Sequence, residues 1–176
     1  MAGHQLRTRK GRQRRKDDAL EELHADGVPL VGVDVSGAFL QGIDLSRANL
    51  LRANFRAADV RSGNLSGAQM QYVDLASANL RHADLRNADL RKATLQDADL
   101  TGANLGEADF EGANLAKSDL RNSDFRNTKW QKIEAIKLAN VFGIKNAPPD
   151  FLNWAIQNGA VSTESDTEWQ ALLARE

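Results

Sequence analysis

The side chains best suited to acid–base chemistry are ten aspartates that recur at one fixed place in the sequence. Each of them directly precedes a large hydrophobic residue, and the set runs from Asp34 to Asp124. Paired carboxylates serve as acid and base in many hydrolytic enzymes. Here a regular repeat places carboxylates along the whole chain, so we expect them to bond to nearby turns or to water instead of forming a catalytic pair.

The other reactive side chains do not form a catalytic or metal-binding pattern either. The histidines His4, His24 and His82 are far apart, and the chain has no cysteine, so the ligand spacing of a metal site is missing. The serines have no nucleophile-elbow context, and no glycine-rich phosphate loop precedes a helix. The sequence therefore predicts a non-catalytic protein with no metal ion and no cofactor.

Large hydrophobic residues recur at every fifth position from Leu30 to Trp130. This column holds 14 Leu, 3 Phe, 2 Val, 1 Met and 1 Trp, and a second column two positions earlier holds 13 Ala among its 21 members. A spacing of two residues puts both columns on one face of an extended segment. Because the period is odd, each repeat needs a corner, and four right-angled corners close a coil of about 20 residues, stacked about 4.8 Å from the next.

The corners are indicated by residues that tolerate a positive φ. Glycine or asparagine often stands two positions after the large hydrophobic residue, at Gly32, Gly37, Gly42, Gly67, Gly102, Gly112, Asn87, Asn122 and Asn127. The interior of the stacked coils is called the shaft here, and the outer faces of the coils are called the walls. Alanine in the second column suits a narrow shaft, because the backbone around it leaves little room for a larger side chain. The pattern therefore predicts a repeat architecture whose stacked coils share one hydrophobic interior.

Units such as ADLRN, ADLTG, ANLGE and ADFEG resemble the pentapeptide repeat family, whose pattern is A(D/N)LXX. The resemblance covers residues 28–130. It implies an all-β solenoid, a right-handed quadrilateral β-helix with four pentapeptides per coil and about five coils. The terminal repeats depart from the pattern, as capping repeats do, with alanine replaced at Val28, Val33, Ile43, Ser118, Ser123 and Thr128.

We expect four segments in chain order. Residues 1–15 form a basic, disordered tail, residues 16–27 an N-terminal capping helix, residues 28–130 the β-helix and residues 131–176 a C-terminal helical cap. The apolar spacing in KDDALEELHAD, with Gly27 after it, predicts the first of these helices.

The period of five ends at Trp130, which lies in the inward column and is expected to plug the shaft. The spacing of Ile133, Ile136 and Val141 then predicts a helix that ends near Gly143.

Two further helices are predicted near the C-terminus. One, FLNWAIQN, is capped by Asp150 and ends at Gly159. The other, DTEWQALLARE, begins after Ser165, which forms a capping-box pair with Glu168. The whole stack of coils is called the tower here. The family resemblance implies that in some members such helices join the towers of two chains into a dimer. The candidate dimer contacts are Phe151, Trp154 and Trp169. The alternative is that these aromatic residues merely close the core.

The N-terminal segment carries seven positive charges and no acidic residue. A basic run of this kind binds phosphates or other anions by releasing counterions. It contains no aromatic side chain on which a base would stack, and a solubilising tail is the alternative. The candidate nucleic-acid or anion contacts are Arg7, Arg9, Lys10, Arg12, Arg14, Arg15 and Lys16.

The outward positions of the repeats alternate in sign, with 12 basic and 13 acidic residues between positions 30 and 129. The family resemblance implies two functions. Well-understood members mimic DNA, bind DNA gyrase or topoisomerase IV and in some cases protect them from quinolones, which needs a mainly acidic tower. Because the walls are mixed, we expect a rigid protein-binding scaffold, and DNA mimicry is the alternative.

Two groups of outward residues are candidate binding surfaces. Leu51 and Tyr72 share one wall with Arg52, Arg91 and Lys92, and an aromatic side chain among cations is a common contact point. A second wall carries the stack Arg61, Arg81 and Arg121. Isolated exposed hydrophobic residues are also common on ordinary surfaces. Phe39 points outward as well, and we expect the N-terminal helix to cover it.

Composition gives an expectation for location. The net charge is −1, and the absence of cysteine fits a reducing compartment. No apolar run approaches the roughly 20 residues that span a bilayer. We therefore expect a cytoplasmic protein.

Overall fold

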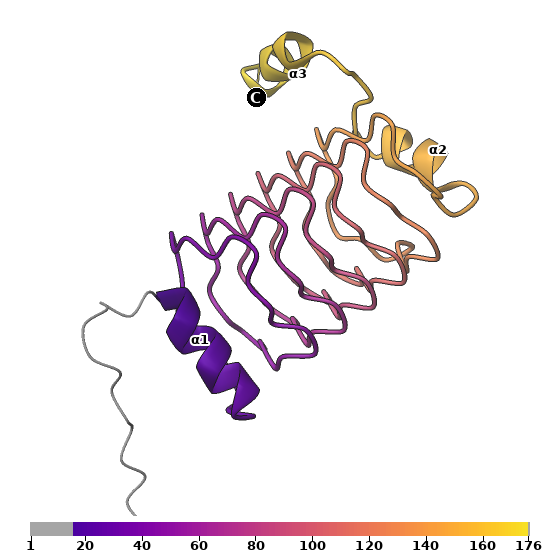
Figure 1. Ribbon diagram of the computed structural model, residues 1–176. Helices are drawn as coiled ribbons and strands as arrows, with labels where there is room; N and C mark the ends of the chain where they lie inside the picture. Colours follow the sequence, from indigo (N-terminus) through magenta and orange to yellow (C-terminus); the bar gives the residue numbers. More distant parts are fainter. Residues whose placement is uncertain (1–15, 176) are drawn as a thin grey trace, which may run out of the picture.

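The computed structural model describes residues 16–175. Helix α1 (Lys16–Ala25) lies across the first coil of a long stack of coils, and helices α2 (Phe151–Gln157) and α3 (Asp166–Leu173) lie at the opposite end (Figure 1). The predicted N-terminal helix is therefore confirmed, two residues shorter than expected at its C-terminal end.

The coils stack through parallel bridges between residues 20 positions apart. These bridges run from the pair Asp34 and Asn54 to the pair Asp109 and Lys129 without a break in register. Each bridge is isolated, because a corner follows only two residues after the bridging residue. Four corners therefore occur in each 20-residue coil, and every coil is one solenoid turn without long strands.

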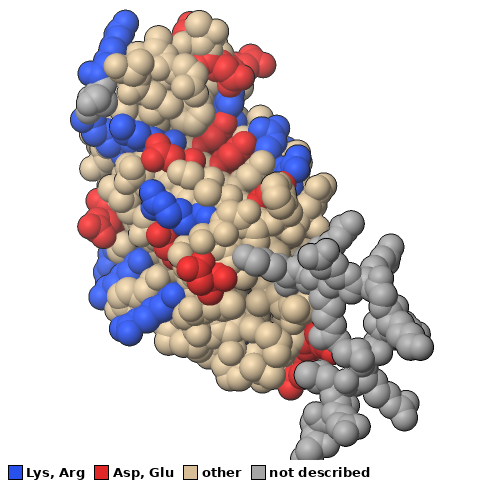
Figure 2. All heavy atoms as spheres, turned by 90° about the vertical axis from the view of Figure 1, so that its left-hand side faces the viewer, with Lys and Arg blue, Asp and Glu red and all other residues tan. Residues whose placement is uncertain are grey.

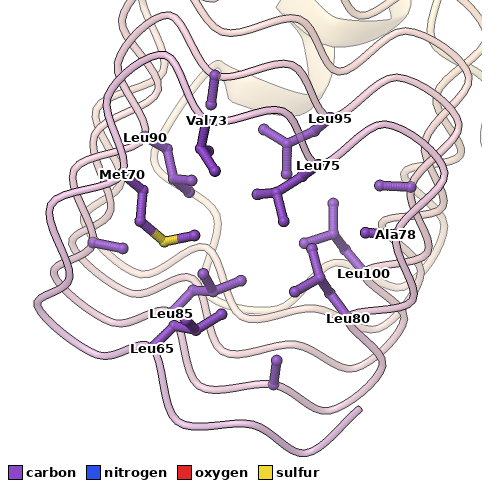
Figure 3. Packing of buried hydrophobic residues seen from close by; sticks show 14 of the residues in the cluster. Leu65, Met70, Val73, Leu75, Ala78, Leu80, Leu85, Leu90, Leu95 and Leu100 are labelled. Carbon is purple, nitrogen blue, oxygen red and sulfur yellow. The ribbon is translucent and has the colours of Figure 1, made fainter. Parts of the chain in front are cut away.

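Both hydrophobic columns point into the shaft. The large residues from Leu30 to Trp130 are all buried, as are all 13 alanines of the second column. Figure 3 shows Leu65, Met70, Leu85 and Leu90 among the side chains that meet inside the coils. The predicted inward assignment is confirmed, with Val28 exposed at the open end.

Three hydroxyl side chains replace alanine in the shaft near the C-terminal end. Ser118, Ser123 and Thr128 are buried, and each hydroxyl donates to the carbonyl oxygen three residues earlier, at 2.6–3.2 Å. Burying a hydroxyl is tolerated only when it is bonded. These bonds explain why polar residues fit a hydrophobic column.

Every corner from Gly32 to Asn127 contains a residue with positive φ, two positions after the large residue. The predicted glycines have this conformation, but so do many other residues, including Arg52, Tyr72 and Lys92 at φ 57–58°. The left-handed conformation costs a residue with a Cβ about 1–2 kcal/mol. Bonds to the next coil compensate, as where the Tyr72 N–H donates to the Arg91 carbonyl at 3.0 Å.

The helix predicted through Ile133, Ile136 and Val141 is wrong, because the coils continue through this segment. The coil after Trp130 contains one extra residue. The separation in sequence between bridged residues therefore changes from 20 to 21 at the pair Asn114 and Ala135. Ile136 and Val141 remain buried in the shaft. The shifted repeat ANVFG, at 139–143, lies outside the register of multiples of five and therefore resembles the end of a helix in the sequence pattern.

Helix α1 closes only part of the first coil. Leu20 is buried over the shaft, Glu21 accepts a bond from the Asp44 N–H at 2.9 Å, and a ring nitrogen of His24 lies 2.9 Å from the Ser46 carbonyl oxygen. Phe39 stays 83% exposed, so the expected cover over it is wrong. The polar contacts of Glu21 and His24 go to Asp44 and Ser46, in the repeat after the one that carries Phe39.

The C-terminal end is closed by stacked aromatic rings. The ring of Phe125 lies 4.8 Å from that of Phe151 in α2, and Trp130 meets Phe151 at 5.6 Å. Trp130 therefore closes the shaft together with α2. Asp150 has φ 67° and makes no side-chain cap, so its predicted capping role is wrong.

The start of α3 confirms only half of the predicted capping box. The Ser165 hydroxyl accepts from the Glu168 N–H. The expected second bond, from the Ser165 N–H to the Glu168 carboxylate, is replaced by two bonds to Thr163. The Glu168 carboxylate accepts from the Thr163 hydroxyl at 2.6 Å, and the Ser165 N–H donates to the Thr163 hydroxyl oxygen at 3.2 Å.

Candidate functional site

The repeated aspartates bond to the corners that follow them. In each, a carboxylate oxygen accepts the N–H two residues later, as between Asp44 and Ser46 at 2.9 Å and between Asp84 and Arg86 at 3.1 Å. Asparagine does the same at equivalent positions such as Asn54. The expectation that these carboxylates serve turns is confirmed.

Acidic and basic side chains pair along the walls. Arg61 bonds to Asp59 at 2.6 Å and Arg86 bonds to Asp84 at 2.6 Å, whereas Arg81 reaches across to Asp99 in the next coil at 3.2 Å. Figure 2 shows acidic and basic side chains interspersed over one face of the tower. The predicted mixture of acidic and basic residues on the walls is confirmed.

Hydrogen bonds to these carboxylates lower their pKa values. The Arg61 side chain holds the pKa of Asp59 below its ordinary value, and the Arg86 side chain does the same for Asp84. At Asp44 the main cause is the backbone N–H of Ser46. These three groups therefore stay ionised at neutral pH and give no general acid.

Arg121 has a structural role that the sequence did not indicate. It bonds to Asp119 and to Asp166 of α3, both at 2.6 Å, and its guanidinium lies 5.5 Å from the Trp169 ring centroid. The side-chain hydrogen bond to Asp119 raises its pKa. Its side chain is only 16% exposed, so Arg121 holds α3 against the wall and is not an open contact residue.

The candidate dimer contacts are mostly buried within the chain. Phe151 is inaccessible, and Trp169 donates its ring N–H to the Leu138 carbonyl at 2.9 Å. Trp154 is partly buried against Trp130, at 5.3 Å between ring centroids. These rings close the core, and Phe151 and Trp169 are not surface contacts. The exposed apolar residues of α2 are instead Leu152 and Ile156, which the sequence pattern did not single out.

Three of the five residues on the Leu51 wall come together at one corner. Arg52 lies 5.6 Å from the Tyr72 ring centroid, and the Lys92 ammonium lies 5.3 Å from the centroid and 3.3 Å from the Tyr72 hydroxyl. We call Arg52, Tyr72 and Lys92 the Tyr72 corner. Leu51 is half-buried, and Arg91 is bound to Asp89 at 2.6 Å. Tyr72 itself is 49% exposed.

The basic run falls almost wholly outside the described residues. Positions 7–15 are not described, and Lys16 enters only as the first residue of α1. Its predicted anion contacts therefore stay predictions.

A shallow hollow of about 690 Å³ lies on the wall beside the Tyr72 corner. Its charged lining is largely paired, with Asp89 bound to Arg91 and Asp109 bound to Lys129 at 3.1 Å. Within residues 16–175, no group of three or more His, Asp or Glu side chains is arranged to hold a metal ion. No helix in the same part of the chain has the length and hydropathy to cross a membrane.

Several known structures are similar to this chain at low sequence identity. The Rfr23 protein of the cyanobacterium Cyanothece 51142 is 20% identical over 82% of this chain and 97% of its own, with a TM-score of 0.52. A protein of the Arabidopsis thaliana thylakoid lumen is 24% identical over 78% of this chain and 81% of its own, with a TM-score of 0.37. Full-length QnrB1, a plasmid-mediated fluoroquinolone resistance protein, is 16% identical over 82% and 85%, with a TM-score of 0.27.

No curated protein matches this chain. The model of the pentapeptide repeats matches it in eight copies, at residues 30–67, 68–106 and 95–129. These matched segments are the ones whose coils stack at 20-residue intervals. The chain belongs to the pentapeptide repeat family.

Proposed function

We propose that this chain is a non-catalytic scaffold that binds another protein on its outer surface. The observation that carries the proposal is the contrast between a shaft packed with nearly uniform side chains and corners that carry a different residue in almost every coil. A continuous core makes the stack of coils stiff, and a stiff surface loses less entropy when it binds. The shape that fits this role is a right-handed quadrilateral helix of about five coils, acting in the cytoplasm.

The charged groups support a binding role over an enzymatic one. The wall carboxylates accept hydrogen bonds from corners and arginines, as Asp59 and Asp84 do. A general acid would need a raised pKa, whereas the side-chain hydrogen bonds from Arg61 and Arg86 lower the pKa values of Asp59 and Asp84.

DNA mimicry is the competing function for a tower of this family. It requires a mainly acidic surface, and the walls of this chain alternate in sign, which weighs against it. A gyrase supercoiling assay separates the two functions. A scaffold for other proteins leaves supercoiling unchanged, and inhibition at low protein concentration would favour mimicry.

The proposal is tested by affinity capture. The intact chain is immobilised and exposed to nuclease-treated lysate of its source, and the retained proteins are quantified by mass spectrometry. We expect at least one protein to be enriched reproducibly over a column carrying heat-denatured chain. Equal retention on both columns would contradict the scaffold function.

A further inference from the structure

The Tyr72 corner holds two cations that have no acidic partner. Among the residues that the structure describes, neither Arg52 nor Lys92 forms an ion pair with a carboxylate, whereas Arg61, Arg86 and Arg91 all do. The charges of Arg52 and Lys92 lie instead against the ring of Tyr72, at 5.6 and 5.3 Å. Their charge is therefore available to a bound molecule.

The coils before the corner add no acidic residue to it. The positions equivalent to Gln71 and Tyr72 are Leu51 and Arg52 one coil earlier, and Val31 and Gly32 two coils earlier. Arg52 is therefore the one charged residue among these four positions, and no carboxylate there offsets it.

The geometry of the corner keeps the cations in place. Arg52, Tyr72 and Lys92 occupy equivalent positions in three successive coils, so the two charges are held about 10 Å apart along the tower. A Cβ on Gly112, one coil further on, would lie 3.0 Å from the Lys92 Cγ, so this glycine leaves room for the lysine stem. Pre-positioned side chains lose less entropy when they bind.

The same geometry disfavours a nucleobase. Single-stranded nucleic acid binds by stacking bases on an open aromatic face. Arg52 lies 5.6 Å from the Tyr72 ring centroid and the Lys92 ammonium lies 3.3 Å from the Tyr72 hydroxyl, so two cations crowd the ring and compete with a base for it. Carboxylates need no open ring face, because they bond to the guanidinium and ammonium groups directly.

We infer that the Tyr72 corner, Arg52, Tyr72 and Lys92, binds an acidic segment of a partner protein. The inference deepens the proposed scaffold function and rests on it. Glutamate or aspartate side chains of the segment bond to Arg52 and to Lys92, and the exposed edge of Tyr72 contacts the chain between them.

Tyr72 is the single tyrosine of the sequence, so it provides a local reporter. The full chain is labelled with 3-fluorotyrosine, and its one fluorine resonance is followed during titration with a hexaglutamate peptide at low ionic strength. We expect a saturable shift that weakens as salt is added. Binding of the peptide elsewhere, as on the N-terminal basic run, leaves this resonance in place.

Two double variants of equal charge change give the comparison. Arg52→Gln with Lys92→Gln should weaken the apparent affinity for hexaglutamate by at least about tenfold. Arg86→Gln with Arg126→Gln, on a different wall, should leave it unchanged. Equal weakening in both variants, or an unmoved resonance in the parent chain, would overturn the inference. A larger shift with oligothymidylate than with hexaglutamate would also overturn it, in favour of a nucleic-acid site.

Failure here is distinguishable from failure of the scaffold function. If hexaglutamate does not move the Tyr72 resonance but the chain still captures a protein, the inference of an acidic segment at the Tyr72 corner is wrong. The proposed scaffold function is then retained. If the chain captures no protein, the scaffold function itself fails.

Discussion

The shaft and the corners of this tower use the same repeat in opposite ways. Inside, leucine and alanine recur at nearly every coil, and the buried positions are almost interchangeable. At the corners one backbone conformation, with φ near 57°, carries Arg52, Tyr72, His82 and Asn87 alike. Packing therefore restricts which residues fit the inward positions, whereas the corner backbone accepts almost any side chain. Corner residues can therefore vary to suit a binding partner without disturbing the core.

The largest expected effect comes from a charge placed in the shaft. Leu90→Asp buries a carboxylate among apolar side chains with no partner, and we expect the chain not to fold cooperatively. The matched control is Asn87→Asp, at a corner of the same coil, which should melt like the parent chain. Thermal melting of both variants is measured by circular dichroism. Similar melting of the two variants would contradict the inward assignment of Leu90.

The next effect compares two neighbours on α2. Phe151 is inaccessible and Leu152 is 42% exposed. Phe151→Ala removes a ring that stacks on Phe125 and packs edge to face with Trp130, and it should cost about 3–5 kcal/mol of unfolding free energy. Leu152→Ala should cost less than about 1 kcal/mol. Urea unfolding gives both values, and a loss of the same size at Leu152 would show that α2 packs differently.

A third comparison uses two ion pairs of equal length and unequal burial. Arg121 and Asp119 meet at 2.6 Å with side chains 16% and 7% exposed, whereas Arg86 and Asp84 meet at 2.6 Å with 56% and 29% exposed. Arg121→Gln leaves buried Asp119 without its charged partner, so we expect a loss of about 1–3 kcal/mol. Arg86→Gln should change the urea midpoint little, because solvent screens that pair. Equal midpoints for the two variants would exclude the anchoring role of Arg121.

The smallest expected effect concerns the corner backbone alone. Ala57 has φ 55°, so Ala57→Gly relieves strain and should raise stability by about 0.5–1 kcal/mol. The reverse change, Gly32→Ala, introduces strain at φ 66°, and its new Cβ would meet nothing within 4 Å. Thermal unfolding should therefore shift in opposite directions for the two variants. A shift in the same direction would mean that the corner conformation is not what limits these positions.

The sequence was sufficient for the regular part of the fold. A period of five with large and small inward columns predicts the shaft, and the corner residues predict the turns, because both signals recur many times and reinforce each other. One extra residue after Trp130 was enough to hide the next coil, since Ile133, Ile136 and Val141 then show helical spacing.

The surface was harder to predict than the shaft. Sequence placed Arg52, Tyr72 and Lys92 on one wall, because positions 20 apart stack. The sequence pattern did not distinguish these three residues from Arg91, whose charge is neutralised by Asp89. Arg121 was misjudged for a related reason, since its partners Asp166 and Trp169 come from a helix more than 40 residues away in sequence. Long-range pairing of this kind leaves no periodic trace.

The central claim is that packing and binding reside in different residues, and two variants test it most directly. Leu90→Ala should lower the melting temperature, since truncating a buried leucine costs about 2–5 kcal/mol, and should still retain the captured partner at temperatures where it is folded. Arg52→Gln with Lys92→Gln should keep the melting temperature and lose the partner. Retention of the partner by the corner variant, or a fall in its melting temperature as large as that of Leu90→Ala, would contradict the account.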